Sequence, residues 1–383
     1  MVLYKDLELE SNKIDTVVLA GGAYYGLLYI GLIKFLEDYN IYNSINNTYG
    51  VSIGSIFALL ICLKIEYKTL LEYLTTIFNP NEFIKVNGAD VLNIIEDYGV
   101  NDGNIVENTI KKLLEINGYS PYITFKELYE ATNVKLNIGL VKLIANEFIL
   151  INHINYPDYP VWLAIRASVS VPFIFNPIKD IILNDILIDG GMLNNLPVRN
   201  YLLEYYYSDY GQSLLKKQAN DKLKKKTIVK DKEKIETSKN DKKLSKKMKH
   251  DVKKSKSIIN KINKLTQSDS NNNNLENNLE TIKYNQNFIS ININQNIYQN
   301  IDIHNISFLK YIELVFNKLF TNQHHHREKY LQYTCNIDLD MTNEYIKKIK
   351  LFNNELTMND YLKISDIGYN YVLEYYNNIL LKK

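Results

Sequence analysis

The chain has 383 residues, of which 46% are apolar, enough for one large or two ordinary domains with a sizeable core. Its net charge of +2 hides an asymmetry: a stretch that starts at Lys216 and ends at Lys264 holds 20 lysines against 6 acidic residues, a net charge of +14, which leaves −12 for the rest. Two cysteines exclude a disulfide framework and suit a reducing compartment. Without a secretory signal or an apolar run of about 20 residues, we expect a cytoplasmic protein that meets membranes only from the surface.

The first half of the chain opens with two strand-turn-helix units. Residues 15–20 form a β-branched run that ends at Gly21 and Gly22, and residues 25–36 then carry apolar side chains at helical spacing. Residues 46–51 follow as a second short strand and lead into an apolar helix. Two such units in succession predict an α/β fold with a parallel sheet, whose active groups gather at the carboxyl ends of the strands.

The second turn carries a Gly-x-Ser-x-Gly pattern, formed by Gly50, Ser52 and Gly54 at the foot of that helix. In a strand-turn-helix elbow the serine occupies a sharp corner, and the glycines permit a tight backbone and close substrate approach. The helix N-terminus adds partial positive charge where an oxyanion would form. The alternative is a helix entry with a capping serine and two packing glycines.

The middle of the chain predicts a helical excursion over residues 67–117 and then a return to the sheet. Thr124 and Glu127 have capping-box spacing, which indicates a helix start. The elements expected after it are strands over 135–143 and 148–152, a helix over 161–171 ended by Pro172, and a hairpin over 181–188 that turns at Asn184 and Asp185 and runs into Asp189, Gly190 and Gly191.

From residue 208 the composition changes to lysine and then asparagine, and we expect residues 208–283 to be a disordered insertion. We assign residues 1–207 to the core and residues 284–383 to its completion, with a strand over 288–293 and helices over 307–320 and 359–381. The basic stretch is a solvated spacer, a contact for anionic membrane, or a nucleic-acid or nuclear-targeting segment. Because aromatic interleaving is missing, we expect no specific nucleic acid.

Three pieces can together perform acyl transfer: the glycine loop of residues 20–26, the Ser52 elbow and Asp189. A serine needs a base, and the developing oxyanion needs backbone N–H groups. None of the six histidines, which are His153, His250, His304 and residues 324–326, adjoins a strand end with glycine punctuation. Asp189 is therefore the best candidate base, although a triad that uses His304 or His324 stays open.

Bound groups are not required by these patterns. The glycine loop lacks both the Gly-x-Gly-x-x-Gly spacing and a P-loop lysine, which disfavours a nucleotide or phosphate cradle. The triple histidine at 324–326 lacks a second cluster of metal ligands, so a solvated face is the better interpretation. We expect neither a metal nor a cofactor.

The order of glycine loop, Gly-x-Ser-x-Gly and Asp-Gly-Gly resembles the patatin-like phospholipases, a family of Ser-Asp acyl hydrolases with a three-layer α/β fold. Further stretches that resemble the family are ITFKELY at 123–129, AIRAS at 164–168, VPFIFNP at 171–177 and IDGGMLNNLPV at 188–198. The resemblance covers residues 15–206 and, more faintly, 364–372. It implies a phospholipase A-type esterase, EC 3.1.1, that acts on phospholipid or another lipid ester.

The resemblance also assigns roles to residues. It implies that Ser52 is the nucleophile and Asp189 its base. The remaining implied positions are the oxyanion-hole residues Gly21, Gly22 and Ala23, and the motif glycines Gly26, Gly50, Gly54, Gly190 and Gly191.

The glycine loop departs from the family at two positions. Ala23 stands where the family usually has a third glycine, and Tyr25 stands where it has Arg or Lys. Alanine disfavours a positive φ, and loss of the cation removes electrostatic help at the oxyanion. The alternative to an active hydrolase is therefore a weak or inactive patatin-like protein that binds lipid or membrane.

Overall fold

The structure is a computed structural model, which describes residues 14–77, 96–207, 288–294, 334–340, 342–350 and 356–381. Residues 1–199 and 286–383 form one compact unit, and residues 200–285 form a second, of which only 200–207 are described. The expected disordered insertion, the expected helix over 307–320 and all histidines except His153 lie outside the described residues.

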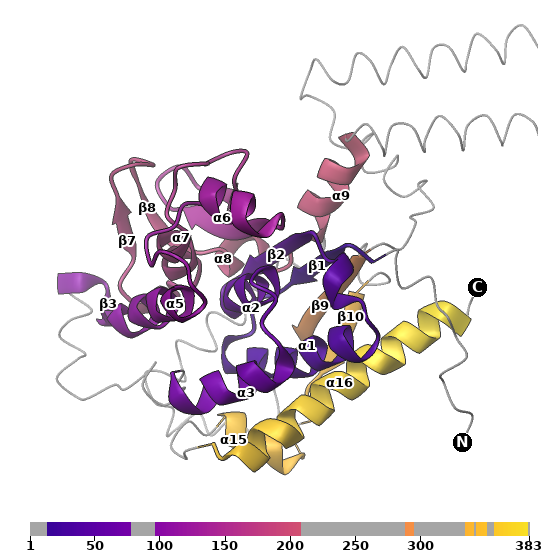
Figure 1. Ribbon diagram of the computed structural model, residues 1–383. Helices are drawn as coiled ribbons and strands as arrows, with labels where there is room; N and C mark the ends of the chain where they lie inside the picture. The colour runs from indigo at the N-terminus through magenta and orange to yellow at the C-terminus, as the bar shows by residue number, and fades with distance from the viewer. Residues whose placement is uncertain are drawn as a thin grey trace, which may run out of the picture. The chain divides into compact units, whose positions relative to one another are not determined.

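A mainly parallel sheet of eight strands is the centre of the first unit (Figure 1). The order is β10-β9-β1-β2-β4-β8-β7, and β5 also pairs with β4. The bounds are β1 (Thr16–Leu19), β2 (Asn47–Val51), β4 (Lys135–Lys142), β5 (Glu147–Ile151), β7 (Ile178–Asp180), β8 (Asp185–Asp189), β9 (Phe288–Asn294) and β10 (Thr334–Asp338). Parallel pairing joins β10, β9, β1, β2 and β4, which confirms the predicted α/β class.

The pairing of β4 brings the ends of two other strands together. Residues 138 and 139 of β4 pair with both β2 and β5, and residues 140–142 pair with both β5 and β8. Because a strand has only two edges, β2 and β8 share one edge of β4 and meet there. Val51 lies opposite Gly139, and Asp189 lies opposite Leu140. The residue after β2 and the last residue of β8 are thus brought to one place.

Helices flank the sheet, and α2 packs directly on β1, β2 and β4. The helices are η3 (Ala23–Leu28), α1 (Tyr29–Asp38), η4 (Tyr42–Ser44), α2 (Ile53–Cys62), α3 (Tyr67–Thr76), α5 (Asn104–Ile116), α6 (Phe125–Thr132), α7 (Val161–Ser168), α8 (Gly191–Asn194), α9 (Val198–Tyr207), α15 (Glu344–Lys350) and α16 (Met358–Leu381). From Gly54 to Cys62 every residue of α2 is buried, as its apolar sequence predicts. None of the helices in the described ranges is both long and apolar enough to cross a bilayer.

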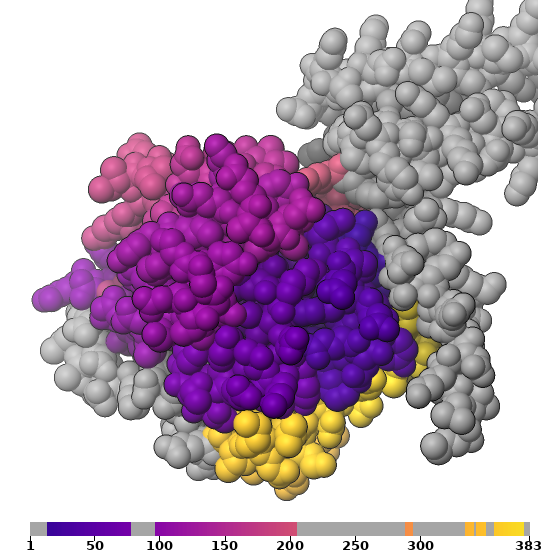
Figure 2. All heavy atoms as spheres, viewed as in Figure 1, coloured from indigo at the N-terminus to yellow at the C-terminus, as the bar shows by residue number. Residues whose placement is uncertain are grey.

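The C-terminal helix α16 packs along α1, and Figure 2 shows its yellow surface against the indigo N-terminal part. Two glycines permit this close approach. A Cβ on Gly31 would lie 2.2 Å from the Tyr369 nitrogen, and one on Gly368 would lie 2.0 Å from the Leu28 oxygen. The last helix therefore belongs to the same core as the first.

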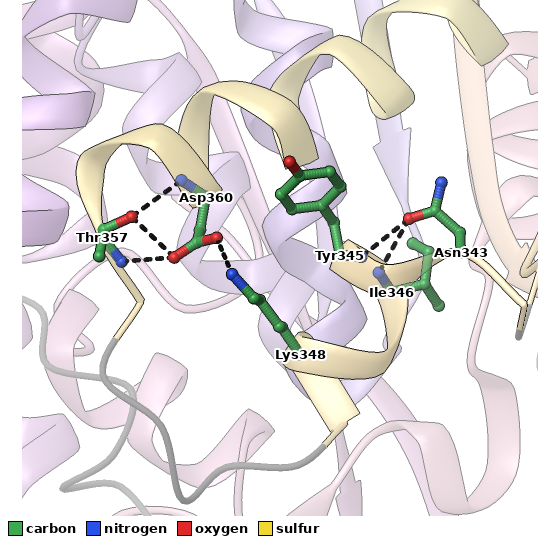
Figure 3. Close-up of polar contacts among 6 residues, drawn as sticks. All are labelled: Asn343, Tyr345, Ile346, Lys348, Thr357 and Asp360. Atoms are coloured by element: carbon green, nitrogen blue, oxygen red, sulfur yellow. Dashed lines mark hydrogen bonds and ion pairs between the residues drawn. The ribbon is translucent and has the colours of Figure 1, made fainter.

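Local side-chain contacts fix the start of α16 and its link to α15 (Figure 3). The Asp360 carboxylate accepts hydrogen bonds from the Thr357 N–H at 2.9 Å and from the Thr357 hydroxyl at 2.7 Å, and it pairs with Lys348 at 2.6 Å. Asn343 caps α15 by accepting from the N–H groups of Tyr345 and Ile346.

The capping box of Thr124 and Glu127 is confirmed, because both reciprocal hydrogen bonds are present. Several element bounds, however, differ from the sequence prediction. The excursion expected to be helical also contains β3 (Gly99–Asn101), which pairs with β6 (Phe173–Phe175). The helix expected over 161–171 ends at Ser168, before Pro172.

The predicted hairpin bounds are wrong, because the residues proposed as its first strand, Ile181 to Leu183, form the turn instead. The apolar run misled the prediction, since aliphatic side chains are unusual in a turn.

Candidate active site

Ser52 forms a strained corner between β2 and α2. Its φ of 53° and ψ of −128° lie outside the conformations that non-glycine residues favour, which costs of order 1 to 3 kcal/mol. Although Ser52 is the N-cap residue of α2, its side chain makes no capping hydrogen bond. The interpretation of Ser52 as a capping serine is therefore wrong, and its hydroxyl is not committed to the helix.

The motif glycines allow the end of β2, the start of α2 and the glycine loop to approach one another closely at this corner. A Cβ on Gly50 would lie 2.3 Å from the Gly54 oxygen, and one on Gly54 would lie 2.6 Å from the Ala20 oxygen. A Cβ on Gly26 would lie 2.3 Å from the Ile53 side chain. These glycines thus have the packing role that the sequence suggested, because they let the Ser52 elbow pack against the glycine loop.

A buried serine that sequence reasoning gave no role holds the corner in place. The Ser52 N–H donates to the Ser168 Oγ at 2.9 Å, and the Ser168 hydroxyl donates to the Gly139 oxygen at 2.6 Å. Ser55 adds a second contact, because its hydroxyl and its N–H both donate to the Ser52 oxygen. The only earlier signal for Ser168 was the AIRAS stretch, which resembled the family without giving this residue a function.

Asp189 is fully buried where β8 meets the end of β2. Its Oδ1 accepts from the Gly191 N–H at 2.7 Å, while its Oδ2 accepts no hydrogen bond of standard geometry from the described residues. Burial raises the pKa of Asp189 to about 7, and the neighbouring Ser52 hydroxyl and the Gly191 N–H oppose this rise by stabilising the carboxylate. A carboxyl group with such a pKa exchanges protons near neutral pH.

Arg166 supports the end of β8 through Ser170. The Asp189 N–H donates to the Ser170 oxygen at 2.9 Å, and Arg166 Nη1 donates to the Ser170 Oγ at 2.6 Å. Arg166 Nη2 also donates to the Asp102 oxygen at 2.7 Å. The guanidinium fits because Gly103 has no side chain; a Cβ there would lie 2.1 Å from it. Burial lowers the pKa of Arg166 to about 10.

The glycine loop adjoins the serine, since a Cβ on Gly21 would lie 3.0 Å from the Ser52 Cβ. The Gly21 N–H donates to the Asn195 oxygen at 3.2 Å, and Asn195 Nδ2 donates back to the Gly21 oxygen at 2.9 Å. The Gly21 N–H is therefore engaged within the protein, whereas Ala23, as first residue of η3, has no acceptor for its N–H within that helix.

Both departures in the glycine loop have structural consequences. Ala23 adopts a φ of 48°, the left-handed conformation in which a glycine would be unstrained. Tyr25, where the family has a cation, is buried, and its N–H donates to the Gly22 oxygen at 3.1 Å. The loop keeps its turn at the expense of backbone strain, and the cation is absent from position 25.

An apolar pocket of about 100 Å³ lies over Ser52. Besides Ser52, its lining residues are Ala23, Tyr24, Ile53, Ile56, Val106, Val169, Val171, Ile174 and Phe175. The sequence suggested five residues as walls for an acyl chain, which are Leu27, Leu28, Val169, Phe173 and Phe175. Val169 and Phe175 line the pocket, Leu27 and Leu28 are core residues outside it, and Phe173 is exposed and does not line it. Such a lining suits a hydrocarbon chain next to the serine hydroxyl.

His153 is the one histidine within the described residues, and it lies away from Ser52. It follows β5, which runs antiparallel to β4, so it lies toward the amino end of β4 and not at the carboxyl end that holds the site. Its ring stacks on Tyr129 at 3.7 Å. The interpretation of His153 as non-catalytic agrees with this position.

Comparison with known proteins gives one family and several partial relatives. The family model of the patatin-like phospholipases matches residues 17–201. A probable lipid hydrolase of Invertebrate iridescent virus 6 is 29% identical over 195 residues, which are 50% of this chain and 64% of that protein. Triacylglycerol lipase 5 of Saccharomyces cerevisiae is 27% identical over 168 residues, 42% of this chain and 22% of that protein.

Among solved structures, VipD from Legionella pneumophila matches with 14% identity and a TM-score of 0.34, covering 48% of this chain and 47% of its own. The chain therefore spans less than two thirds of each of these relatives.

Proposed function

Because residues 17–201 are a patatin-like phospholipase domain, we propose that this protein is a lipid acyl hydrolase with Ser52 as nucleophile and Asp189 as base. One observation carries the proposal. The Ser52 hydroxyl, at a strained corner, makes no helix-capping hydrogen bond and lies between a buried carboxyl group and an apolar pocket. The names of the viral lipid hydrolase and the yeast lipase support a lipid ester as substrate.

In the first step of the proposed mechanism the Ser52 oxygen bonds to the acyl carbonyl carbon, and the Asp189 carboxylate accepts the serine proton. The carbonyl π electrons move to oxygen, and the backbone N–H groups at Gly22 and Ala23 stabilise this oxyanion. The ester C–O bond then breaks, and the alcohol leaves with the proton from Asp189. Water attacks the acyl-serine in the same manner and releases the fatty acid.

The Gly21 N–H is already bonded to the backbone oxygen of Asn195. Of the three residues that the family resemblance implies, we therefore propose that Gly21 positions the loop and that Ala23, whose N–H has no acceptor within η3, holds the oxyanion together with Gly22. Loss of one such donor typically costs about 3 to 4 kcal/mol of transition-state stabilisation, so a displaced N–H at the strained Ala23 would lower the rate by about two to three orders of magnitude.

A carboxyl base suits this site because its pKa of about 7 is close to the pH at which the enzyme would work. A solvated aspartate, with a pKa near 4, would be a much weaker base for a serine hydroxyl. Burial therefore supplies the basicity that a histidine supplies in a Ser-His-Asp triad. The substrate class that the apolar pocket favours is a phospholipid or another lipid with a fatty acyl ester.

The test is release of fatty acid from mixed phospholipid vesicles by wild type, Ser52→Ala and Asp189→Asn, with covalent labelling by a serine-reactive phosphonate. We expect release by wild type only, and no phosphonate adduct with Ser52→Ala. Full activity of Asp189→Asn, or loss of activity in His304→Ala or His324→Ala, would contradict the dyad. Lipid binding by a folded wild type without release or labelling would identify an inactive lipid-binding protein.

The contact between the lysine-rich stretch and anionic membrane stays a prediction, since residues 216–264 lie outside the described residues. Deleting that stretch should weaken binding to anionic liposomes if it is a membrane contact and should leave binding unchanged if it is a spacer.

A further inference from the structure

Two neighbouring turns expose aliphatic side chains to solvent. The turn between β4 and β5 carries Leu143 and Ile144, which are 49% and 72% exposed, and the turn between β7 and β8 carries Ile181 and Ile182, which are 94% and 65% exposed. Short turns normally hold Gly, Asn, Asp or Ser. We call these four residues the apolar tips, and a cluster of this kind marks an interaction surface.

The two turns are held together as one surface. The Asp185 carboxylate, at the start of β8, accepts from the Ile144 N–H at 2.8 Å and from the Ala145 N–H at 3.2 Å. The Leu143 N–H also donates to the Ile186 oxygen at 2.8 Å. On the β7 side, the buried Asp180 accepts from the Leu183 N–H at 2.6 Å. These contacts keep the apolar tips side by side and exposed.

The apolar tips project from the same edge of the sheet as Ser52. The parallel pairing places Val51 opposite Gly139, and β4 continues past that point to Lys142 before it turns. Leu143 is four residues beyond Gly139, so an extended strand at about 3.3 Å per residue places it about 13 Å beyond the level of Val51 and about 10 Å beyond the level of Ser52. Since β8 runs antiparallel to β4, the turn before it lies at the same end (Figure 1).

We propose that the apolar tips insert into the interfacial region of a phospholipid bilayer and hold the Ser52 pocket at the membrane surface. This inference rests on the proposed function, because it assumes that the substrate lies in a bilayer. Neither turn contains a charged residue. An interfacial contact of this kind reaches about 5 to 10 Å into the headgroup and acyl boundary, which is comparable to the projection of the tips beyond the site.

A tyrosine and a lysine lie at the depth where a bilayer's headgroups would be. Lys142 of β4 pairs with Leu187 of β8, and Lys179 of β7 pairs with the preceding residue of β8, Ile186, so Lys179 lies one residue closer to the turns than Lys142. The Lys179 Nζ lies 5.3 Å from the ring centre of Tyr98. Tyr98 is exposed. Tyrosine and lysine are side chains that favour the membrane-water interface, so this pair forms a polar rim at the level of Leu143, at the base of the two turns.

The test uses the full chain with vesicles of ether-linked phosphatidylcholine, which contain no acyl ester and carry no net charge. Zwitterionic vesicles minimise the contribution of the lysine-rich stretch. For the double variant Ile144→Asp with Ile181→Asp, the vesicle partition coefficient should fall at least tenfold, since burying one aliphatic side chain changes an equilibrium by about tenfold or more. Turnover of a water-soluble short-chain ester should stay within about twofold of wild type, because neither residue lines the pocket.

Ile154→Asp is the matched control. Ile154 is 63% exposed, but it follows β5 and so lies toward the opposite edge of the sheet. It should bind vesicles like wild type. As a second measurement, Ile181→Trp should show a blue-shifted fluorescence on addition of vesicles, and Ile154→Trp should not. All variants should keep the wild-type melting temperature, because the changed side chains are exposed.

Two results would overturn the inference: unchanged partitioning of the double variant, or a self-association in solution that the same substitutions abolish. The second result would assign the apolar tips to a contact between two copies of the chain. Because the ether lipid cannot be hydrolysed, binding is measured independently of catalysis. A wild type that binds through the apolar tips but releases no fatty acid from ester lipids would refute the proposed hydrolase and leave the inference standing.

Discussion

Replacing Asp189 by Asn should abolish turnover and also change how stability depends on pH. The folded-state pKa of Asp189 is raised from 3.8 to about 7, so the folded protein binds a proton that the unfolded chain has already lost between these values. Stability therefore falls as pH rises through this window. The full effect is about 4 kcal/mol, from roughly 1.4 kcal/mol per pKa unit, and about 2 to 3 kcal/mol of it appears between about pH 5 and about pH 8.

Urea unfolding of wild type and Asp189→Asn over that pH range measures this effect directly. As the pH rises, the variant should gain about 2 to 3 kcal/mol of unfolding free energy relative to wild type. Any destabilisation by the amide itself is the same at every pH and does not affect this change. In wild type, kcat/KM should rise through a midpoint near pH 7, because the base acts only when ionised. A difference in stability that does not change with pH, together with a kinetic midpoint near 4, would refute the argument from burial.

Three further substitutions test the support around the site. Ala23→Gly should relieve the strain at a φ of 48° and raise the unfolding free energy by up to about 1 kcal/mol, with activity equal to or above wild type; clear destabilisation in urea would contradict this. Ser168→Ala should lower the unfolding free energy by about 2 to 4 kcal/mol and remove most of the activity, because it leaves the Ser52 N–H and the Gly139 oxygen without their partner. Ser55→Ala should lower it by only about 1 kcal/mol, because the Ser52 oxygen still accepts from the Ser55 N–H. Ile56 lines both the Ser52 pocket and a second pocket of about 30 Å³ between α2, α3 and α5. Ile56→Ala should join the two pockets and shift the preferred substrate toward longer acyl chains in a series of p-nitrophenyl esters. An unchanged chain-length preference would show that the two pockets do not join.

Local patterns in the sequence predicted the class of fold and the proposed nucleophile, Ser52. Strand-turn-helix units, the Gly-x-Ser-x-Gly spacing and the capping box of Thr124 and Glu127 depend on contacts within a few residues, so the order of residue types is enough to predict them. The missing side chain of Gly50 makes room for the backbone of Gly54, four residues away, which is a local contact, whereas the missing side chain of Gly54 makes room for the oxygen of Ala20 in the distant glycine loop.

The tertiary structure decided which groups support the site and what their chemistry is. Ser168 reaches Ser52 from 116 residues away, and Arg166 reaches the Asp102 oxygen from 64 residues away, so no local pattern could reveal these two contacts. The pKa of Asp189 is set by burial where β2 and β8 meet, and the engagement of the Gly21 N–H depends on Asn195. Exposure of an aliphatic turn is likewise a property of the packed molecule, which is why Ile181 was predicted as a strand residue and is found at a tip.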